Sequence, residues 1–136
     1  TKPLFKNPFK GWVQWGENAN IDFLQNFNII FVLINWSEIE KTEGVYHWEQ
    51  FEHTWQIDFD LPERSYVFRL VLDYPAQKPK QWIPSWLLES ISNSGTNYDT
   101  PEIGKGFSPD YTHKLLLKKH EVFIQKLADF MKRCRL

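Results

Sequence analysis

The segment from Asn28 to Asn35, which reads NIIFVLIN, constrains the fold more than any other part of the chain. Between its two asparagines the run is entirely apolar and has the length of one β-strand. A strand with one wet face alternates apolar and polar residues, whereas an unbroken apolar run is typical of a strand buried on both faces. Parallel sheets covered by helices supply that environment. This segment therefore predicts a buried parallel strand in an α/β domain.

Further strand and helix patterns alternate on both sides of this segment. We predict strands at residues 11–15, 28–35 and 65–73, and helices at 21–27, 48–55 and from about 112 to 135. Residues 1–10 are expected to form an irregular lead-in, and 74–112 a long loop with a short helix starting at Pro84. This order predicts a single α/β domain, residues 1–136, of the parallel βαβαβα type.

Two of the predicted helices have a clear apolar face. In the helix at 48–55, Trp48, Phe51 and Trp55 recur at spacings of three and four residues, which places them on one side. In the last helix, one side carries apolar residues and the other carries polar ones. The apolar side consists of Leu116, Phe123, Leu127, Phe130 and Cys134, and the polar side of Lys118, Glu121, Gln125 and Lys132.

Charge and composition narrow the classes of partner. A net charge of −1 argues against nucleic acid or an anionic membrane as the main partner. No apolar run has the roughly 18 residues of a membrane span. The single cysteine, Cys134, excludes a disulfide within the chain, so cysteine usage does not identify the compartment. The chain begins on Thr1, which fits a removed leader among other origins, and a secreted or periplasmic location is the favoured expectation.

Three βα units are too few to close a barrel, because a (β/α)8 barrel takes roughly 250 residues. Three parallel strands on their own leave two open edges, which proteins normally cover or pair. The chain is therefore expected to be either a small open α/β domain or the first three units of a larger TIM-type barrel. In a barrel, the fourth strand would follow the last helix.

Several segments carry a resemblance to a known family. They are NPFKGW, NWSEIEKTEGVYHWEQFE, FRLVLDYP, WIPSWL and EVFIQKLADFM. Together they resemble the start of clan A (β/α)8-barrel glycoside hydrolases, namely β-galactosidase-like enzymes and related bacterial glycosidases of unassigned substrate. The family pattern W-x-x-x-E-P-x-x-G-x-Y-x-W is matched by Trp36, Glu40, Gly44, Tyr46 and Trp48. The sequence departs from it at Lys41, where the family often has proline.

The resemblance implies carbohydrate hydrolysis by two carboxyl groups that this chain does not supply. In the family, the acid/base and the nucleophile follow strands four and seven, so no catalytic residue is expected within residues 1–136. The chain alone is expected to be inactive. The alternative is a non-catalytic α/β module that binds carbohydrate or another partner and buries its open edges by oligomerising. A third possibility, a small α/β enzyme of another kind, has no motif in its favour.

Three carboxylates and one arginine are candidates for contact with sugar hydroxyls. Glu17, Glu38 and Asp73 follow the three predicted strands, at the end of the sheet where such barrels place the active site. Each could equally be a surface carboxylate or a charge at a helix start. Arg69 lies inside an apolar strand, so we interpret it as pointing inward and pairing with a carboxylate such as Asp73. The alternative is that it extends outward to solvent.

Four tryptophans are candidates for stacking on sugar rings, because indole packs well against C–H faces. Trp15 and Trp36 stand where predicted strands end, and Trp82 and Trp86 lie in the long third loop. Core packing is the more frequent fate of tryptophan, so one or two of the four are expected to contact ligand. For the Glu43-Gly44 turn with Tyr46 and Trp48 we favour a structural role.

No metal or cofactor is expected. The four histidines lack the spacing of a metal site, and the motifs of nucleotide-binding loops and of serine hydrolases are not found. The expected partners are carbohydrate and either the remainder of a barrel or further copies of the chain.

Overall fold

The computed structural model describes residues 13–15, 29–55, 57–58 and 64–133, and within them the chain is mixed α/β. It divides into two compact units. Unit 1 comprises Thr1–Leu33 and Glu49–Arg69, and unit 2 comprises Ile34–Trp48 and Leu70–Leu136. Glu17, Cys134 and the helix predicted at 21–27 lie outside the described residues.

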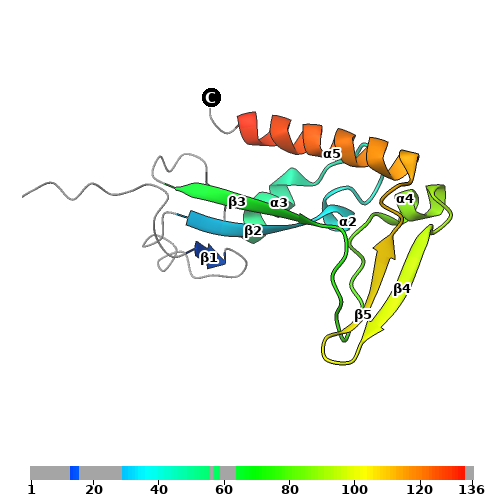
Figure 1. The fold of residues 1–136 in the computed structure, drawn as a ribbon. Coiled ribbons are helices and arrows are strands. Elements are labelled where there is room, and N and C mark those ends of the chain that lie inside the picture. The colour runs from blue at the N-terminus through cyan, green and yellow to red at the C-terminus, as the bar shows by residue number, and fades with distance from the viewer. Residues whose placement is uncertain (1–12, 16–28, 56, 59–63, 134–136) are drawn as a thin grey trace, which may run out of the picture. The chain divides into compact units, whose positions relative to one another are not determined.

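The first sheet has the strand order β1-β2-β3 (Figure 1). Its strands are β1 (Val13–Trp15), β2 (Ile29–Asn35) and β3 (Ser65–Val71). β1 pairs with β2 in parallel, in a register that runs from Val13 opposite Ile29 to Trp15 opposite Phe31. The three predicted strands are therefore confirmed, with ends that differ by about two residues at most, as is usual for element boundaries. Ile30, Val32 and Ile34 of β2 are almost completely buried, as the unbroken apolar run predicts.

The helix α3 (Trp48–Trp55) belongs to unit 1 except for its first residue, Trp48, which belongs to unit 2. Its apolar side buries Phe51 and Trp55, as predicted from their spacing. The ring of Phe51 lies 6.4 Å from that of Phe68 on β3. Trp55 lies 5.6 Å from Trp15, whose ring also stacks on Phe31. Aromatic contacts thus connect α3 with β1 and β3.

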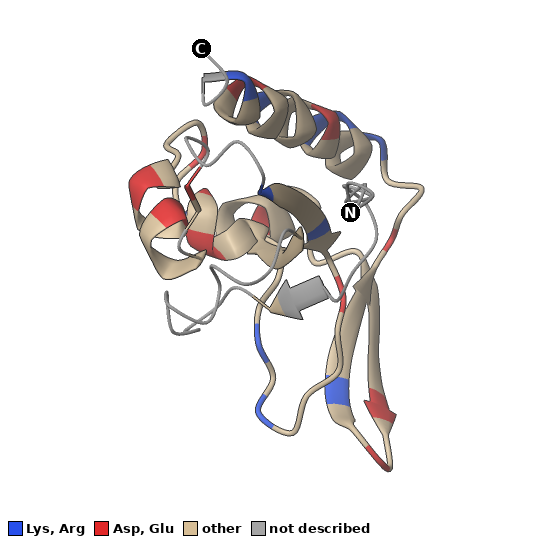
Figure 2. Ribbon diagram, turned by 90° about the vertical axis from the view of Figure 1, so that its left-hand side faces the viewer, with Lys and Arg blue, Asp and Glu red and all other residues tan. Residues whose placement is uncertain are grey.

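Unit 2 contains the end of β2, the short helix α2 (Trp36–Ile39) and the long helix α5 (Lys114–Arg133). The predicted last helix is confirmed, and Leu116, Phe123, Leu127 and Phe130 form its buried side. The predicted polar side is exposed, and Figure 2 shows both basic and acidic residues along this helix. No helix among the described residues has both the length and the apolar character needed to cross a membrane.

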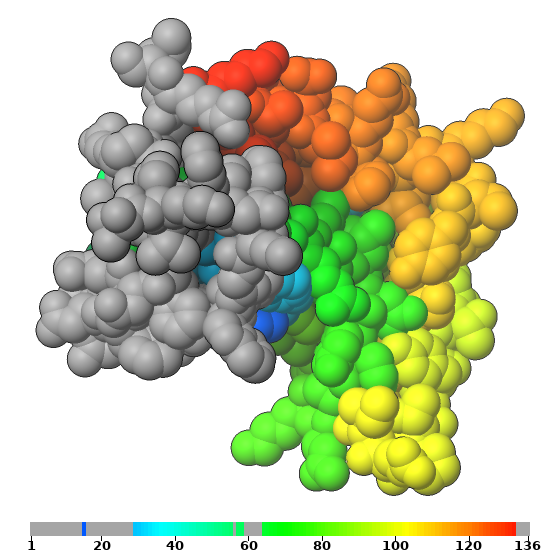
Figure 3. Space-filling model, turned by 60° about the vertical axis from the view of Figure 1, so that its left-hand side comes forward, coloured from blue at the N-terminus to red at the C-terminus, as the bar shows by residue number. Residues whose placement is uncertain are grey.

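The stretch from 74 to 112 has more regular structure than a long loop. The short helix predicted from Pro84 is confirmed as α4 (Ser85–Ser90). After it, β4 (Gly95–Thr100) and β5 (Gly104–Pro109) form an antiparallel hairpin, with Gly95 opposite Pro109 and Thr100 opposite Gly104. The sequence of this hairpin is polar and glycine-rich and gives no apolar alternation, which explains why the prediction missed it. Figure 3 shows the hairpin, in yellow, beside the green segment that follows β3.

Candidate functional site

The segment from Trp36 to Trp48 is organised around the side chain of Glu40, which is only 3% exposed. The indole nitrogen of Trp36, one helical turn earlier, donates to Glu40 Oε2 at 2.7 Å. The backbone N–H of Gly44 donates to Glu40 Oε1 at 2.8 Å. Gly44 has a φ of +79°, a conformation that glycine adopts at little cost. Both carboxyl oxygens are therefore used to close the turn, and the structural role favoured for this segment is supported.

Tyr46 and Trp48 continue this packing. Their rings stack at 5.6 Å, and Trp48 stacks on Phe130 of α5 at 4.6 Å. Burial, the nearby charge of Glu40 and a side-chain hydrogen bond to Glu40 together raise the pKa of Tyr46 to about 12, and burial is the largest cause. The segment after Gly44 is thus held against α5 by aromatic contacts.

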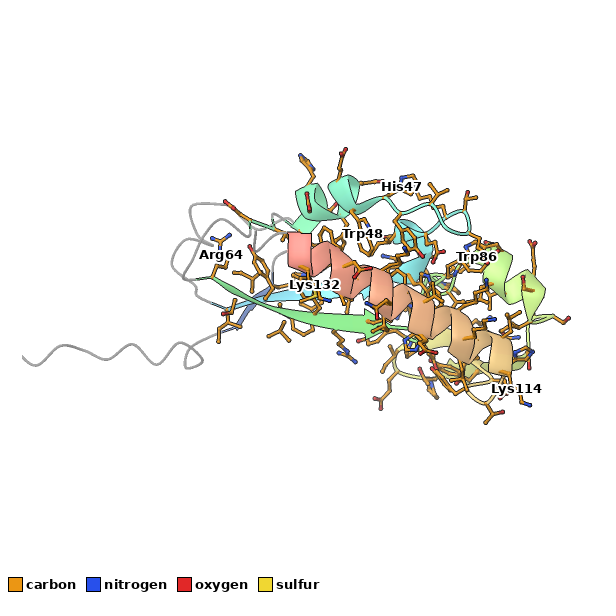
Figure 4. The ribbon with its side chains drawn as sticks, turned by 90° about the horizontal axis from the view of Figure 1, so that it is seen from above. His47, Trp48, Arg64, Trp86, Lys114 and Lys132 are labelled. Carbon is orange, nitrogen blue, oxygen red and sulfur yellow. The ribbon has the colours of Figure 1, made fainter. Side chains whose placement is uncertain are left out.

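Trp36 and Trp86, two of the stacking candidates, belong to the same packed region. Trp36 is fully buried and stacks on Phe123 at 4.9 Å, so its ring has no face left for a sugar, and the predicted ligand contact is corrected to core packing. Trp86 donates its indole N–H to the backbone oxygen of Glu40 at 2.9 Å. Lys119 of α5 lies 6.0 Å from the Trp86 ring. Figure 4 shows Trp48 and Trp86 beside α5 at different points along its length.

A second, exposed group of side chains lies at the C-terminal end of β2 and in the segment after β3. We call Glu38, Tyr74, Lys80 and Trp82 the rim platform. Lys80 Nζ lies 3.0 Å from Glu38 Oε1 and 5.2 Å from the centre of the Trp82 ring. The ring of Trp82 meets that of Tyr74 edge-on at 6.3 Å, and its indole nitrogen donates to the Tyr74 backbone oxygen at 3.4 Å. The prediction named Glu38 and Trp82 and missed Tyr74 and Lys80.

The end of β2 positions this platform through polar contacts with the segment before α4. The side-chain nitrogen of Asn35 and the hydroxyl of Ser37 both donate to the backbone oxygen of Gln81, at 3.2 and 2.7 Å. The backbone N–H of Ser37 donates to the backbone oxygen of Trp82 at 3.2 Å. Asn35 also caps α2 by accepting from the N–H of Ser37. The Asn-Trp-Ser sequence therefore fixes the backbone that carries Trp82.

Asp73, the candidate after β3, is half-buried and accepts a hydrogen bond from the hydroxyl of Tyr98 on β4. This hydrogen bond is the main reason that the pKa of Tyr98 is raised to about 12. Tyr111 is a further neighbour: burial raises its pKa first, and the charge of Asp73 adds to the effect. Sequence reasoning missed Tyr98, because nothing local links residues 25 positions apart.

The remaining candidates lie in unit 1 or outside the described residues. Arg69 is exposed on β3, so the interpretation that it points inward toward a carboxylate is replaced by the solvent-directed alternative. A charged side chain in contact with water requires no buried partner. Trp15 is 43% exposed and contacts Phe31 and Trp55 within unit 1. The placement of Glu17 lies outside the described residues.

Comparison of the chain with protein-family models, curated proteins and solved structures found no match. Within the part of the chain that the structure describes, no three His, Cys, Asp or Glu side chains converge in a way that could hold a metal ion. The candidate site is therefore defined by its own side chains, namely the rim platform with Asp73 beside it.

Proposed function

We propose that this chain is part of a carbohydrate-active protein of the (β/α)8-barrel glycoside hydrolase type, and that the rim platform contacts sugar rings. The observation that carries the proposal is the grouping of two ring systems with opposite charges at an exposed position. Tyr74 is 50% exposed, and Trp82 is half-buried with Lys80 and Glu38 beside it. In parallel α/β folds, ligands bind at the carboxyl ends of strands, where these residues lie.

The chemistry of the platform fits a sugar ring. Indole and phenol rings pack against apolar C–H faces, while carboxylate and ammonium groups hydrogen-bond to hydroxyls. Lys80 lies over the ring of Trp82 at 5.2 Å. An exposed cation–π contact contributes only about 0.5–1 kcal/mol, so a ligand can displace Lys80 from the ring at little cost. Lys80 then remains within reach of the ligand as a hydrogen-bond donor.

In this proposal, hydrolysis requires two carboxyl groups that come from outside these residues. Such groups lie about 5–5.5 Å apart in retaining enzymes and about 6.5–9.5 Å apart in inverting ones. The chain alone would bind carbohydrate without hydrolysing it. A non-catalytic binding module is the alternative, and it would use the same platform. Turnover of aryl glycosides by a longer protein that contains these residues would separate the two, because only the enzyme hydrolyses them.

Binding can be tested directly on the chain by saturation-transfer NMR with a panel of mono- and oligosaccharides. We expect Trp82→Ala to weaken binding about two- to twelvefold, since stacking on one ring contributes roughly 0.5–1.5 kcal/mol. Trp82→Phe, which keeps a ring face, should retain most of the affinity. Leu117→Ala, which removes an exposed apolar side chain from α5, is the matched control and should have no effect. Equal binding by all four proteins would exclude the platform as the site.

A further inference from the structure

We propose that Asp73 recognises one sugar hydroxyl at the edge of the rim platform, and that Tyr98 is the positioning residue that orients its carboxylate. The inference rests on the proposed function. It extends the site to the β4–β5 hairpin, which the sequence did not connect with ligand binding.

The first observation is the hydrogen bonding of the Asp73 carboxylate. The Tyr98 hydroxyl donates to Oδ1, and among the described residues Oδ2 has no hydrogen-bond partner. Asp73 directly precedes Tyr74, whose ring and backbone oxygen both contact Trp82. One oxygen is thus occupied in orienting the group, and the other can accept a hydrogen bond at the residue next in the chain to Tyr74 of the platform. A carboxylate oxygen is a strong acceptor for a sugar hydroxyl.

The second observation is that the hairpin is attached to the same segment at another point. The N–H of Ala76 donates to the backbone oxygen of Lys105 at 2.9 Å, and the N–H of Lys105 donates to the backbone oxygen of Ala76 at 3.0 Å. This pair and the Tyr98 contact with Asp73 join β4 and β5 to residues on both sides of Tyr74. The segment that carries the platform is therefore held along one side by the hairpin.

Two glycines allow this close approach. A Cβ atom at Gly104 would collide with the backbone carbonyl of Ala76, and one at Gly106 would collide with the ring of Tyr98. The hydroxyl of Thr100 closes the turn by donating to the backbone oxygen of Gly104 at 2.9 Å. The absence of side chains at these two positions lets β5 contact the segment after β3 and lets Tyr98 reach Asp73. A carboxylate oriented before the ligand arrives loses less entropy on binding.

The test measures the affinities of methyl β-D-galactopyranoside, methyl β-D-glucopyranoside and their monodeoxy derivatives for the chain and three variants. For the unmodified chain, removal of one particular hydroxyl should weaken binding about tenfold, as expected when a charged acceptor loses its donor. In Asp73→Asn that penalty should shrink to about twofold, and Tyr98→Phe should show an intermediate penalty. Tyr111→Phe removes a phenol hydroxyl whose pKa is raised by the charge of the same carboxylate, and it should keep the full penalty. If Asp73 has only a general structural role, Asp73→Asn should weaken the binding of all ligands equally. The roughly tenfold effect of removing the hydroxyl should then remain.

The outcomes separate this inference from the proposed function. If the penalty in Asp73→Asn and Tyr98→Phe equals that of the unmodified chain while Trp82→Ala loses affinity, the inference is overturned and the proposed function stands. If the unmodified chain binds neither glycoside, the proposed function is overturned, and the inference with it. Amide spectra of each variant establish that the fold is kept, and Tyr98→Phe preserves the ring that packs over Gly106.

Discussion

The indole nitrogen of Trp36 donates a 2.7 Å hydrogen bond to the carboxyl group of Glu40, and both side chains are buried. Glu40 also accepts from the backbone of Gly44, so one acidic side chain connects the short helix α2 with the turn that follows it. A buried carboxyl group is tolerated when donors surround it, and its loss leaves those donors without acceptors.

We therefore predict that Glu40→Ala lowers the free energy of unfolding by about 2 to 4 kcal/mol. The buried indole donor of Trp36 left without an acceptor costs roughly 1–3 kcal/mol, and the turn also loses its hydrogen bond from the N–H of Gly44. Glu121→Ala, at an exposed position of α5, should change it by less than about 0.5 kcal/mol. Urea denaturation followed by tryptophan fluorescence measures both. Equal effects of the two substitutions would contradict a structural role for Glu40.

Two tyrosines should titrate late. The pKa values of Tyr46 and Tyr98 are raised to about 12 from a usual 10, by burial and Glu40 for the first and by the hydrogen bond to Asp73 for the second. A raised phenol pKa means that the folded state holds its proton when the unfolded state has lost it. The stabilising contribution is therefore complete below pH 10 and is lost as the pH rises toward 12.

Absorbance of the tyrosinate ion, recorded as the pH is raised, checks this prediction. Tyr46→Phe and Tyr98→Phe should each remove one group from the last step of the titration. If a variant instead loses a group from an earlier step near pH 10, the pKa of the tyrosine that it replaces is not raised, and the prediction is contradicted for that residue.

Gly104 should tolerate substitution less well than Gly44. Both have positive φ angles, +121° and +79°, but a Cβ at Gly104 meets the backbone of Ala76, whereas one at Gly44 meets nothing within 4 Å. We expect Gly44→Ala to cost about 1 kcal/mol, from backbone conformation alone. Gly104→Ala should cost about 2 to 4 kcal/mol, because a steric clash adds to the backbone strain.

Hydrogen exchange distinguishes the two glycine variants at the residue level. In Gly104→Ala the amides of Ala76 and Lys105, which bond to each other's carbonyls, should exchange faster. In Gly44→Ala they should exchange at the original rate. Unchanged protection in Gly104→Ala would contradict the close approach of β5 to the segment after β3.

His120 should make unfolding sensitive to mild acid. Burial lowers its pKa below the usual 6.5, and its ring lies 6.0 Å from that of Trp36. As the pH falls below 6.5 the unfolded state binds a proton before the folded state does, so stability decreases. His120→Leu should lose less stability than the original chain between pH 7 and pH 5. Leu117→Ala, at an exposed position of the same helix, is the control and should retain the original pH dependence.

Features that depend on residues close together in the sequence were predicted, and features that depend on contacts between distant segments were not. β2 was predicted from its own unbroken run of apolar residues, and α5 from the apolar residues that recur along one side of the helix. The hairpin was missed because glycines and polar residues dominate β4 and β5, and their pairing across a tight turn has no apolar period. The interpretation of Arg69 failed because a charge within a strand is compatible with either face of the sheet, and sequence does not say which face is covered.

The candidate site shows the same division. Sequence indicated that carboxylates and tryptophans gather where strands end, and Glu38, Asp73 and Trp82 were named on that basis. It could not separate Trp36 from Trp82, because the residue that covers Trp36 is Phe123, far along the chain on α5. Nor could it connect Asp73 with Tyr98, which approaches only when the hairpin folds beside it.

The sequence by itself thus determined the strands β1 to β3, the helices α3, α4 and α5, the apolar faces of α3 and α5, and the residue types at the strand ends. These features depend on backbone geometry and on periodicities of a few residues, which any local segment carries. Only the tertiary structure decided which aromatic rings are buried, which carboxyl group closes a turn and which one accepts a hydrogen bond from a tyrosine of the hairpin. Exposure and hydrogen bonding depend on segments that are distant in sequence, and these meet only in the folded chain.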